Sequence, residues 1–147
     1  MKKKLKEIWN WPFLEKLFLI FLIAEVLLVA ISNLTLIDKS LDCDKGLTLR
    51  QAVEFWRNRT LFIKEWTYQT TLEIDCSTFL AIPFYGLTHN VYLSFGIANI
   101  IYTLLLLYFI ANIFAGERPL YFLLTAILIC IPYEIGMLDY YDVFLFG

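Results

Sequence analysis

The 147-residue sequence has little of the charge that most soluble proteins carry. Only 18% of its residues are charged and 60% are hydrophobic, whereas an ordinary soluble domain has about 25% and about 45–50%. So little polar content excludes both a soluble globular domain and a disordered chain. A formal net charge of -2 also excludes a strongly basic nucleic-acid binder. The expected environment of this chain is therefore the membrane.

Cysteine and histidine are scarce as well, with three and one residues respectively. So few cysteines exclude a disulfide-dense secreted scaffold, and His89 has no second histidine with which to form a zinc site. Cys43 and Cys76 share one polar segment and can pair if that face of the membrane is oxidising, although spacing alone does not establish a disulfide. Cys130 falls in an apolar segment. The cysteines and the histidine therefore predict no metal site.

Three apolar stretches are long enough to cross a bilayer, which takes about 20 residues. They cover residues 17–37, 91–114 and 120–138. A short inner turn over residues 115–119 separates the second stretch from the third, and we expect a bend at Pro132 in the third. The predicted fold class is all-α: a multi-pass transmembrane helical bundle with three spans, plus amphipathic juxtamembrane helices in a long outer loop.

The N-terminal segment, residues 1–16, carries five lysines and two glutamates. The positive-inside rule places such a basic segment in the cytoplasm. A cleaved signal peptide has a similar pattern, but the apolar run that follows is long for one and is not followed by an Ala-x-Ala cleavage site. We therefore predict a multi-pass protein of the cell membrane with a cytoplasmic N-terminus. Residues 139–147 then form an outer end, which we interpret as truncated.

Residues 38–90 form the predicted outer loop, with 13 charged residues between Asp38 and Asp75. An amphipathic helix is expected over residues 48–58, starting with a capping box at Thr48. Its apolar face has the helical spacing i, i+3, i+4, i+7 and its other face is polar. The apolar positions are Leu49, Ala52, Val53 and Trp56, and the polar positions are Arg50, Gln51, Glu54, Arg57 and Asn58. A second, interfacial apolar helix over residues 76–87 is too short to cross.

The stretch Ile82-Pro83-Phe84-Tyr85-Gly86-Leu87-Thr88-His89-Asn90 joins the interfacial helix to the second span, and Leu138-Asp139 ends the third. With the loop stretch over residues 61–71 and the order of the helices, these motifs resemble the N-terminal part of the GT-C superfamily. Its members are multi-pass glycosyltransferases that use polyprenyl-phosphate-linked sugars, such as protein mannosyltransferases and aminoarabinose transferases. The resemblance implies sugar transfer from a polyprenyl-phosphate carrier to an acceptor at the outer membrane face. Complete members are much longer, so it also implies a fragment that is inactive at this length.

The family reaction needs a carboxylate at the outer face, to accept a proton, to hold a metal or to orient the donor phosphate. The candidates are Asp44, Asp75 and Asp139. Asp44 and Asp75 belong to acidic pairs that either chelate a divalent cation, the one candidate cofactor, or simply face water. The candidate ligands of a lipid phosphate are Arg50, Arg57, Arg59 and Lys64. These basic residues either meet that phosphate or offset the acids of the same loop.

Two other functions remain open. In the first, the chain is a small non-catalytic multi-pass membrane protein that acts as a binding or assembly subunit. The helix over residues 48–58 would then contact a partner membrane subunit. In the second, the chain is a transporter, for which Glu25 in the first span is the main support. Membrane lipid is an expected partner in every case, and nucleic acid in none.

Glu25 lies near the middle of the first span, where an ionised side chain costs about 2.5 kcal/mol or more. We therefore expect it to be protonated or hydrogen-bonded. The predicted partners are Asn99, Thr103 or Asn112 of the second span. Such a contact would act either as interhelical glue worth roughly 1 kcal/mol or as part of a proton relay.

Overall fold

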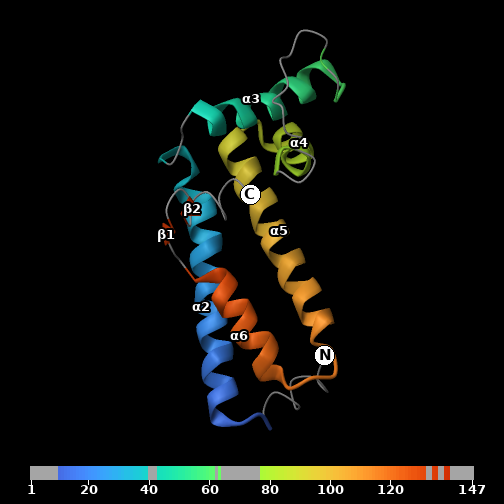
Figure 1. Ribbon diagram of the computed structural model, residues 1–147. Coiled ribbons are helices and arrows are strands. Elements are labelled where there is room, and N and C mark those ends of the chain that lie inside the picture. Colours follow the sequence, from blue (N-terminus) through green and yellow to red (C-terminus); the bar gives the residue numbers. More distant parts are fainter. Residues whose placement is uncertain are drawn as a thin grey trace. The chain divides into compact units, whose positions relative to one another are not determined.

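The computed structural model describes residues 10–39, 43–61, 63, 77–131, 134–135 and 138–139. Its helices are α2 (Phe13–Thr35), the 3-10 helix η1 (Ile37–Lys39), α3 (Cys43–Asn58), α4 (Ser77–Thr88), α5 (Val91–Ile113) and α6 (Pro119–Cys130) (Figure 1). Two short strands follow, β1 (Glu134–Ile135) and β2 (Leu138–Asp139), which pair antiparallel with Ile135 opposite Leu138. Apart from these strands the regular structure of the described residues is helical, as the all-α prediction requires.

Helices α2 and α5 are long and apolar enough to cross a membrane, and both have 23 residues. At 1.5 Å per residue each is about 35 Å long, which exceeds the hydrocarbon core of a bilayer. They correspond to the first two predicted spans. The start of α5 is capped by Asn90, whose side-chain Oδ1 accepts a hydrogen bond from the Leu93 N–H at 3.1 Å. Such a cap satisfies one of the backbone donors left open at a helix start.

The predicted helix over residues 120–138 is wrong as one continuous helix, and a third span is not confirmed. Helix α6 has only 12 residues and ends at Cys130, so it is about 18 Å long and too short to cross a bilayer alone. Ile131 is extended, with φ -67° and ψ 134°. The residue before a proline is sterically disfavoured in the helical conformation, and Pro132 follows Ile131. Pro132 therefore ends the helix at this point instead of bending it.

Helix α3 begins at Cys43, five residues before the predicted start. Thr48 is thus an interior helical position, and the predicted capping box is not the start of the helix. Helix α4 agrees closely with the predicted interfacial helix and tolerates Pro83 in its interior. With 12 residues it is too short to cross a bilayer, as expected.

The chain divides into two compact units, and α2 and α5 contribute to both. Unit 1 combines Met1–Val29 with Leu105–Ile131. Its core lies where α6 packs alongside the first part of α2 and the last part of α5 (Figure 1). The buried core residues are Leu22, Leu107, Leu123, Ala126, Ile127 and Cys130.

Unit 2 combines Ala30–Leu104 with Pro132–Gly147. Here α3 and α4 pack on each other and on the first part of α5 (Figure 1). The buried core residues are Ile37, Leu49, Ala52, Ala81, Phe95 and Ala98. Three of these six side chains are alanines, so the helices of this unit approach one another closely.

Candidate functional site

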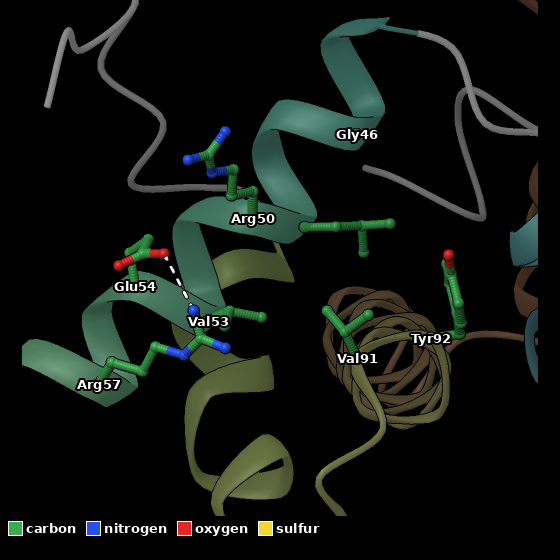
Figure 2. Close-up of a pocket in the computed structure, with 8 residues that line it drawn as sticks. Gly46, Arg50, Val53, Glu54, Arg57, Val91 and Tyr92 are labelled. Atoms are coloured by element: carbon green, nitrogen blue, oxygen red, sulfur yellow. Dashed lines mark hydrogen bonds and ion pairs between the residues drawn. The ribbon is translucent and has the colours of Figure 1, made fainter.

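A pocket of about 370 Å³ lies in unit 2 between α3 and the start of α5 (Figure 2). Its lining residues on α3 repeat at three- and four-residue intervals, which places them on one face of the helix. Those residues are Gly46, Leu49, Arg50, Val53, Glu54 and Arg57, and Val91 and Tyr92 line it from α5. A Cβ atom added at Gly46 would have no described atom within 4 Å. The glycine therefore leaves this end of the pocket open.

The pocket joins an apolar wall to a charged one. Leu49, Val53 and Val91 supply aliphatic side chains, whereas Arg50 and Arg57 supply two guanidinium groups. These two arginines are seven residues apart, or two helical turns, so both lie on the same side of α3. An apolar wall beside two guanidinium groups suits an amphiphilic ligand with an anionic head.

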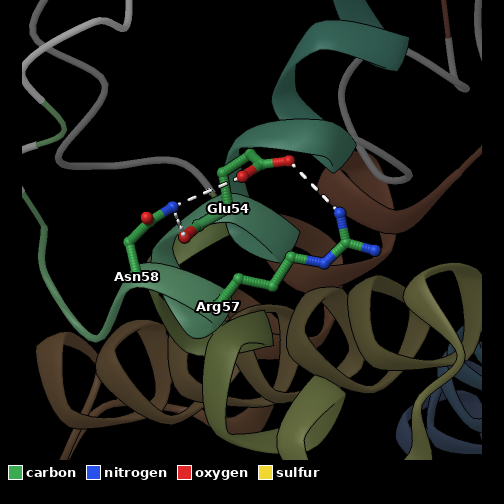
Figure 3. A network of polar contacts seen from close by, with 3 residues as sticks. All are labelled: Glu54, Arg57 and Asn58. Carbon is green, nitrogen blue, oxygen red and sulfur yellow. Dashed lines mark hydrogen bonds and ion pairs between the residues drawn. The ribbon is translucent and has the colours of Figure 1, made fainter.

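Glu54 partly neutralises this charged wall through a small polar network (Figure 3). Arg57 Nη1 lies 3.4 Å from Glu54 Oε1. Asn58 Nδ2 donates to the Glu54 backbone oxygen at 2.9 Å and to the carboxylate Oε2 at 3.3 Å. The Arg57 side chain is 65% exposed, and exposed ion pairs contribute at most about 1 kcal/mol. An anion of higher charge can therefore compete with Glu54 for Arg57.

The other predicted lipid-phosphate residues lie elsewhere. The Arg59 guanidinium stacks 4.0 Å from the centroid of the Trp56 ring, and the backbone φ of 53° at Arg59 is left-handed, just past the end of α3. Arg59 does not line the pocket. Lys64 lies outside the described residues. Of four predicted phosphate ligands, the structure thus brings two together.

The three candidate carboxylates are not gathered at the pocket by the described residues. Asp44 belongs to the first turn of α3, for which only the backbone is described. Asp75 lies outside the described residues. Asp139 was predicted at the end of a transmembrane helix but lies in β2, where its backbone is paired with Glu134. This is a correction that follows from the end of α6 at Cys130.

The buried face of α3 differs from the predicted one. Leu49 and Ala52 are buried as expected, but Phe55 and Gln51 are buried with them. Phe55 stacks on Phe79 of α4, with the ring centroids 5.9 Å apart. The face is rotated because α3 packs on α4 as well as on α5. Val53 consequently points to the pocket (Figure 2).

Sequence reasoning missed two features of this site. Val91 and Tyr92 line the pocket from α5, and no periodicity within the loop predicts a contact with a different helix. Gly86 of α4 lies against Trp56, and a Cβ atom at residue 86 would collide with the indole ring. A glycine inside a helical pattern is the signal for such a close approach.

Buried polar side chains join the helices of unit 2. Asn99 Nδ2 of α5 donates to Asn33 Oδ1 of α2 at 2.9 Å. Ser77 Oγ of α4 donates to Asn99 Oδ1, and Thr103 Oγ1 donates to the Asn99 backbone oxygen at 2.9 Å. A Cβ atom at Gly96 would overlap the Asn33 carbonyl oxygen. The glycine therefore permits the approach that the asparagine pair needs.

The residues predicted as partners of Glu25 have other hydrogen-bond partners. Asn99 and Thr103 make the contacts just described, and Asn112 Nδ2 donates to the Tyr108 carbonyl oxygen at 2.7 Å. The Glu25 Oε2 atom is buried and has no hydrogen-bond partner among the described residues. Within unit 1, the predicted hydrogen bond between Glu25 and Asn112 is therefore not observed.

The histidine and the cysteines form no metal site within the described part of the chain, where no group of three or more His, Cys, Asp or Glu residues is found. His89 sits in the turn between α4 and α5 with φ 52° and lies edge-on to Tyr85. Cys130 is a buried free thiol. The side chains of Cys43 and Cys76 lie outside the described residues.

Comparison with protein-family models, with curated proteins and with solved structures finds no match to this chain. The functional argument therefore depends on the chemistry of the pocket and on the pattern of helices around it.

Proposed function

We propose that the chain forms the donor-binding region of a membrane glycosyltransferase that uses a polyprenyl-phosphate-linked sugar. The observation that carries this proposal is the α3–α5 pocket. It presents Arg50 and Arg57 beside an aliphatic wall, and the donor is a lipid with a phosphate head. The order of the helices around the pocket also matches the order on which the resemblance to the GT-C superfamily depends.

In this proposal α2 and α5 cross the membrane, and α3 and α4 lie at its outer face. The guanidinium groups of Arg50 and Arg57 bind phosphate oxygens through charge-assisted hydrogen bonds, which guanidinium geometry favours. The first isoprene units contact Leu49, Val53 and Val91. Binding of the phosphate displaces Glu54 from Arg57, and the Tyr92 side chain closes the pocket on the α5 side.

Sugar transfer also needs a carboxylate, either as general base or as ligand of a divalent cation. Asp44 is the candidate nearest to the pocket along the chain, because it precedes Gly46 by two residues in α3. Asp75 and Asp139 remain candidates for the same roles.

A binding measurement tests the proposal. The full chain in lipid nanodiscs is titrated with a polyprenyl monophosphate, and complex formation is followed by native mass spectrometry. The double substitution Arg50→Ala/Arg57→Ala is expected to weaken binding at least about tenfold, since a hydrogen bond to a charged group contributes about 1.5–3 kcal/mol. The matched control is Arg59→Ala, which removes an arginine of the same helix end that does not line the pocket.

Two results would contradict the proposal. The first is equal affinity of the double variant and the unaltered chain. The second is equal affinity for the polyprenyl phosphate and for the corresponding polyprenol, because the alcohol has the same tail but no phosphate for the arginines to bind.

A further inference from the structure

Glu25 is the one buried side chain within the described part of the chain that has an oxygen without a hydrogen-bond partner. It is 9% exposed. It lies 12 residues after the start of α2 and 10 residues before its end, which is about 18 Å and about 15 Å along the axis. If α2 crosses the membrane, this carboxyl group lies near mid-depth, where neither interface is within its reach.

The surroundings of Glu25 in unit 1 are apolar. Leu22 lies one turn before it on the same face of α2, and Val26 packs on the same core. From α6, Cys130 is close enough to Glu25 to interact electrostatically with it. Cys130 is uncharged as a thiol and is itself fully buried.

No described cation of unit 1 is close enough to pair with Glu25. Lys16 precedes it by nine residues, about 13 Å along the helix axis. Arg118 is paired with Glu15 at the start of α2. The remaining titratable groups among the described residues of the unit are exposed side chains of α5, of the turn and of the first turn of α6, namely Tyr108, Glu117 and Tyr121.

The free-energy cost of burying a charge favours the neutral form of the Glu25 carboxyl group. A carboxylate buried without a partner is strongly disfavoured when ionised, and the neutral acid avoids most of that cost. Insertion data show the same preference for acidic residues at the centre of a membrane-spanning helix.

We propose that Glu25 is held as a neutral carboxylic acid, a proton-binding site inside the bilayer, and that lipid-soluble carbodiimides modify it selectively. The acid proton moves to a carbodiimide nitrogen while a carboxyl oxygen adds to the central carbon, which gives an O-acylisourea. With little water nearby, the acyl group then shifts from oxygen to nitrogen and gives a stable N-acylurea. The product keeps every atom of the reagent, and no oxidant or leaving group is involved.

The test uses the full chain in lipid vesicles and two reagents. Dicyclohexylcarbodiimide partitions into the bilayer, whereas a water-soluble carbodiimide with glycine ester reports solvent-exposed acids. Peptide mapping by mass spectrometry is expected to find the first reagent on Glu25 and the second on the exposed Glu117. Labelling of Glu117 without labelling of Glu25 would overturn the proposal.

Glu15 is the matched control, because it is on the same helix and is also buried but has Arg118 as its ion-pair partner. Glu25 should react with dicyclohexylcarbodiimide and Glu15 should not. Equal labelling of the two, or labelling of Glu15 alone, contradicts the proposal, because burial without an ion-pair partner would then not be the cause of reactivity.

An infrared measurement on the unlabelled protein reports the protonation state of the carboxyl group without any chemical reagent. The carbonyl stretching band of a protonated carboxylic acid should be present in the unlabelled protein. It should disappear in Glu25→Gln and remain in Glu15→Gln. Absence of this band from the unaltered chain would show an ionised Glu25 and would reject the proposal.

A comparison of native membranes with the purified protein gives one further outcome. If Glu25 reacts with dicyclohexylcarbodiimide only after purification, a basic group of a partner protects it in the membrane, and the proposal is rejected.

Discussion

Arg118 and Glu15 are 103 residues apart in the sequence, yet Arg118 Nη2 lies 3.4 Å from Glu15 Oε1. Glu15 is in the first turn of α2, and Arg118 directly precedes α6. The start of α2 and the turn between α5 and α6 therefore occupy the same end of unit 1. The placement of residues 115–119 on the same side of the membrane as the N-terminal segment stays a prediction.

Membrane sidedness can be tested by cysteine labelling in a background without native cysteines. We expect Asn10→Cys and Gly116→Cys to react with a membrane-impermeant maleimide from the same side, because the Glu15–Arg118 pair holds these segments together. Asn58→Cys and His89→Cys should react from the opposite side. Labelling of Asn10→Cys and Gly116→Cys from opposite sides would exclude a hairpin of α2 and α5.

Substitution of Gly96 should separate α2 from α5 in unit 2. In Gly96→Val the added side chain meets the Asn33 carbonyl oxygen, and overpacking of this kind costs about 1–3 kcal/mol. The matched control is Gly46→Ala. Residue 46 is an interior position of α3, and its added methyl group would have no described atom within 4 Å. This substitution should stabilise the helix by about 0.5–1 kcal/mol. Thermal unfolding in detergent measures both. A Gly96→Val protein as stable as the unaltered chain would contradict the close approach.

Removal of the Asn99 amide should destabilise the protein more than removal of the Asn112 amide. Asn99 joins α2 and α4 to α5, whereas Asn112 is exposed and binds only the carbonyl oxygen of its own helix. Asn99→Leu should lower the free energy of unfolding by about 1–2 kcal/mol, in the range of interhelical hydrogen bonds in membranes, and Asn112→Leu by much less. A double-mutant cycle with Asn33→Ala checks the pair, and a coupling energy of zero would refute it.

Replacement of Pro132 should lengthen α6. In Pro132→Ala the steric restriction on Ile131 is removed, and the apolar sequence after Cys130 can continue the helix. Far-ultraviolet circular dichroism should show a gain of helix content, and the amides after Cys130 should gain protection from hydrogen exchange. Pro119→Ala is the control, because a proline at the first position of a helix does not interrupt it. Unchanged helix content in Pro132→Ala would place the cause of the helix end elsewhere.

The helices that could be predicted are those with local causes. Helices α2, α4 and α5 follow from long apolar runs and from the turn signal around His89 and Asn90, and their observed bounds lie within four residues of the predicted ones. The end of α6 was also present in the sequence, as Pro132. The predicted helix is too long because the residues stay apolar beyond Pro132. The proline nevertheless disfavours the helical backbone conformation at the residue before it, so the helix ends there.

The candidate site could be predicted only in part, for a different reason. The spacing of Arg50 and Arg57 already places them on one face of a helix. The pocket also needs Val91 and Tyr92 of α5, and no pattern within α3 specifies which helix packs beside it. The buried face of α3 likewise depended on contacts such as Phe55 with Phe79 of α4.

The sequence by itself determined that this chain is helical and apolar and where the two long helices α2 and α5 lie, because apolar runs, turns and prolines act on neighbouring residues. The tertiary structure decided which polar groups find partners. Asn99 reaches Asn33 because Gly96 lets two helices touch, and Glu25 has an oxygen without a partner because the described part of α6 presents a thiol and aliphatic side chains toward it. Such pairings depend on how helices distant in the sequence pack together, and no local pattern encodes that.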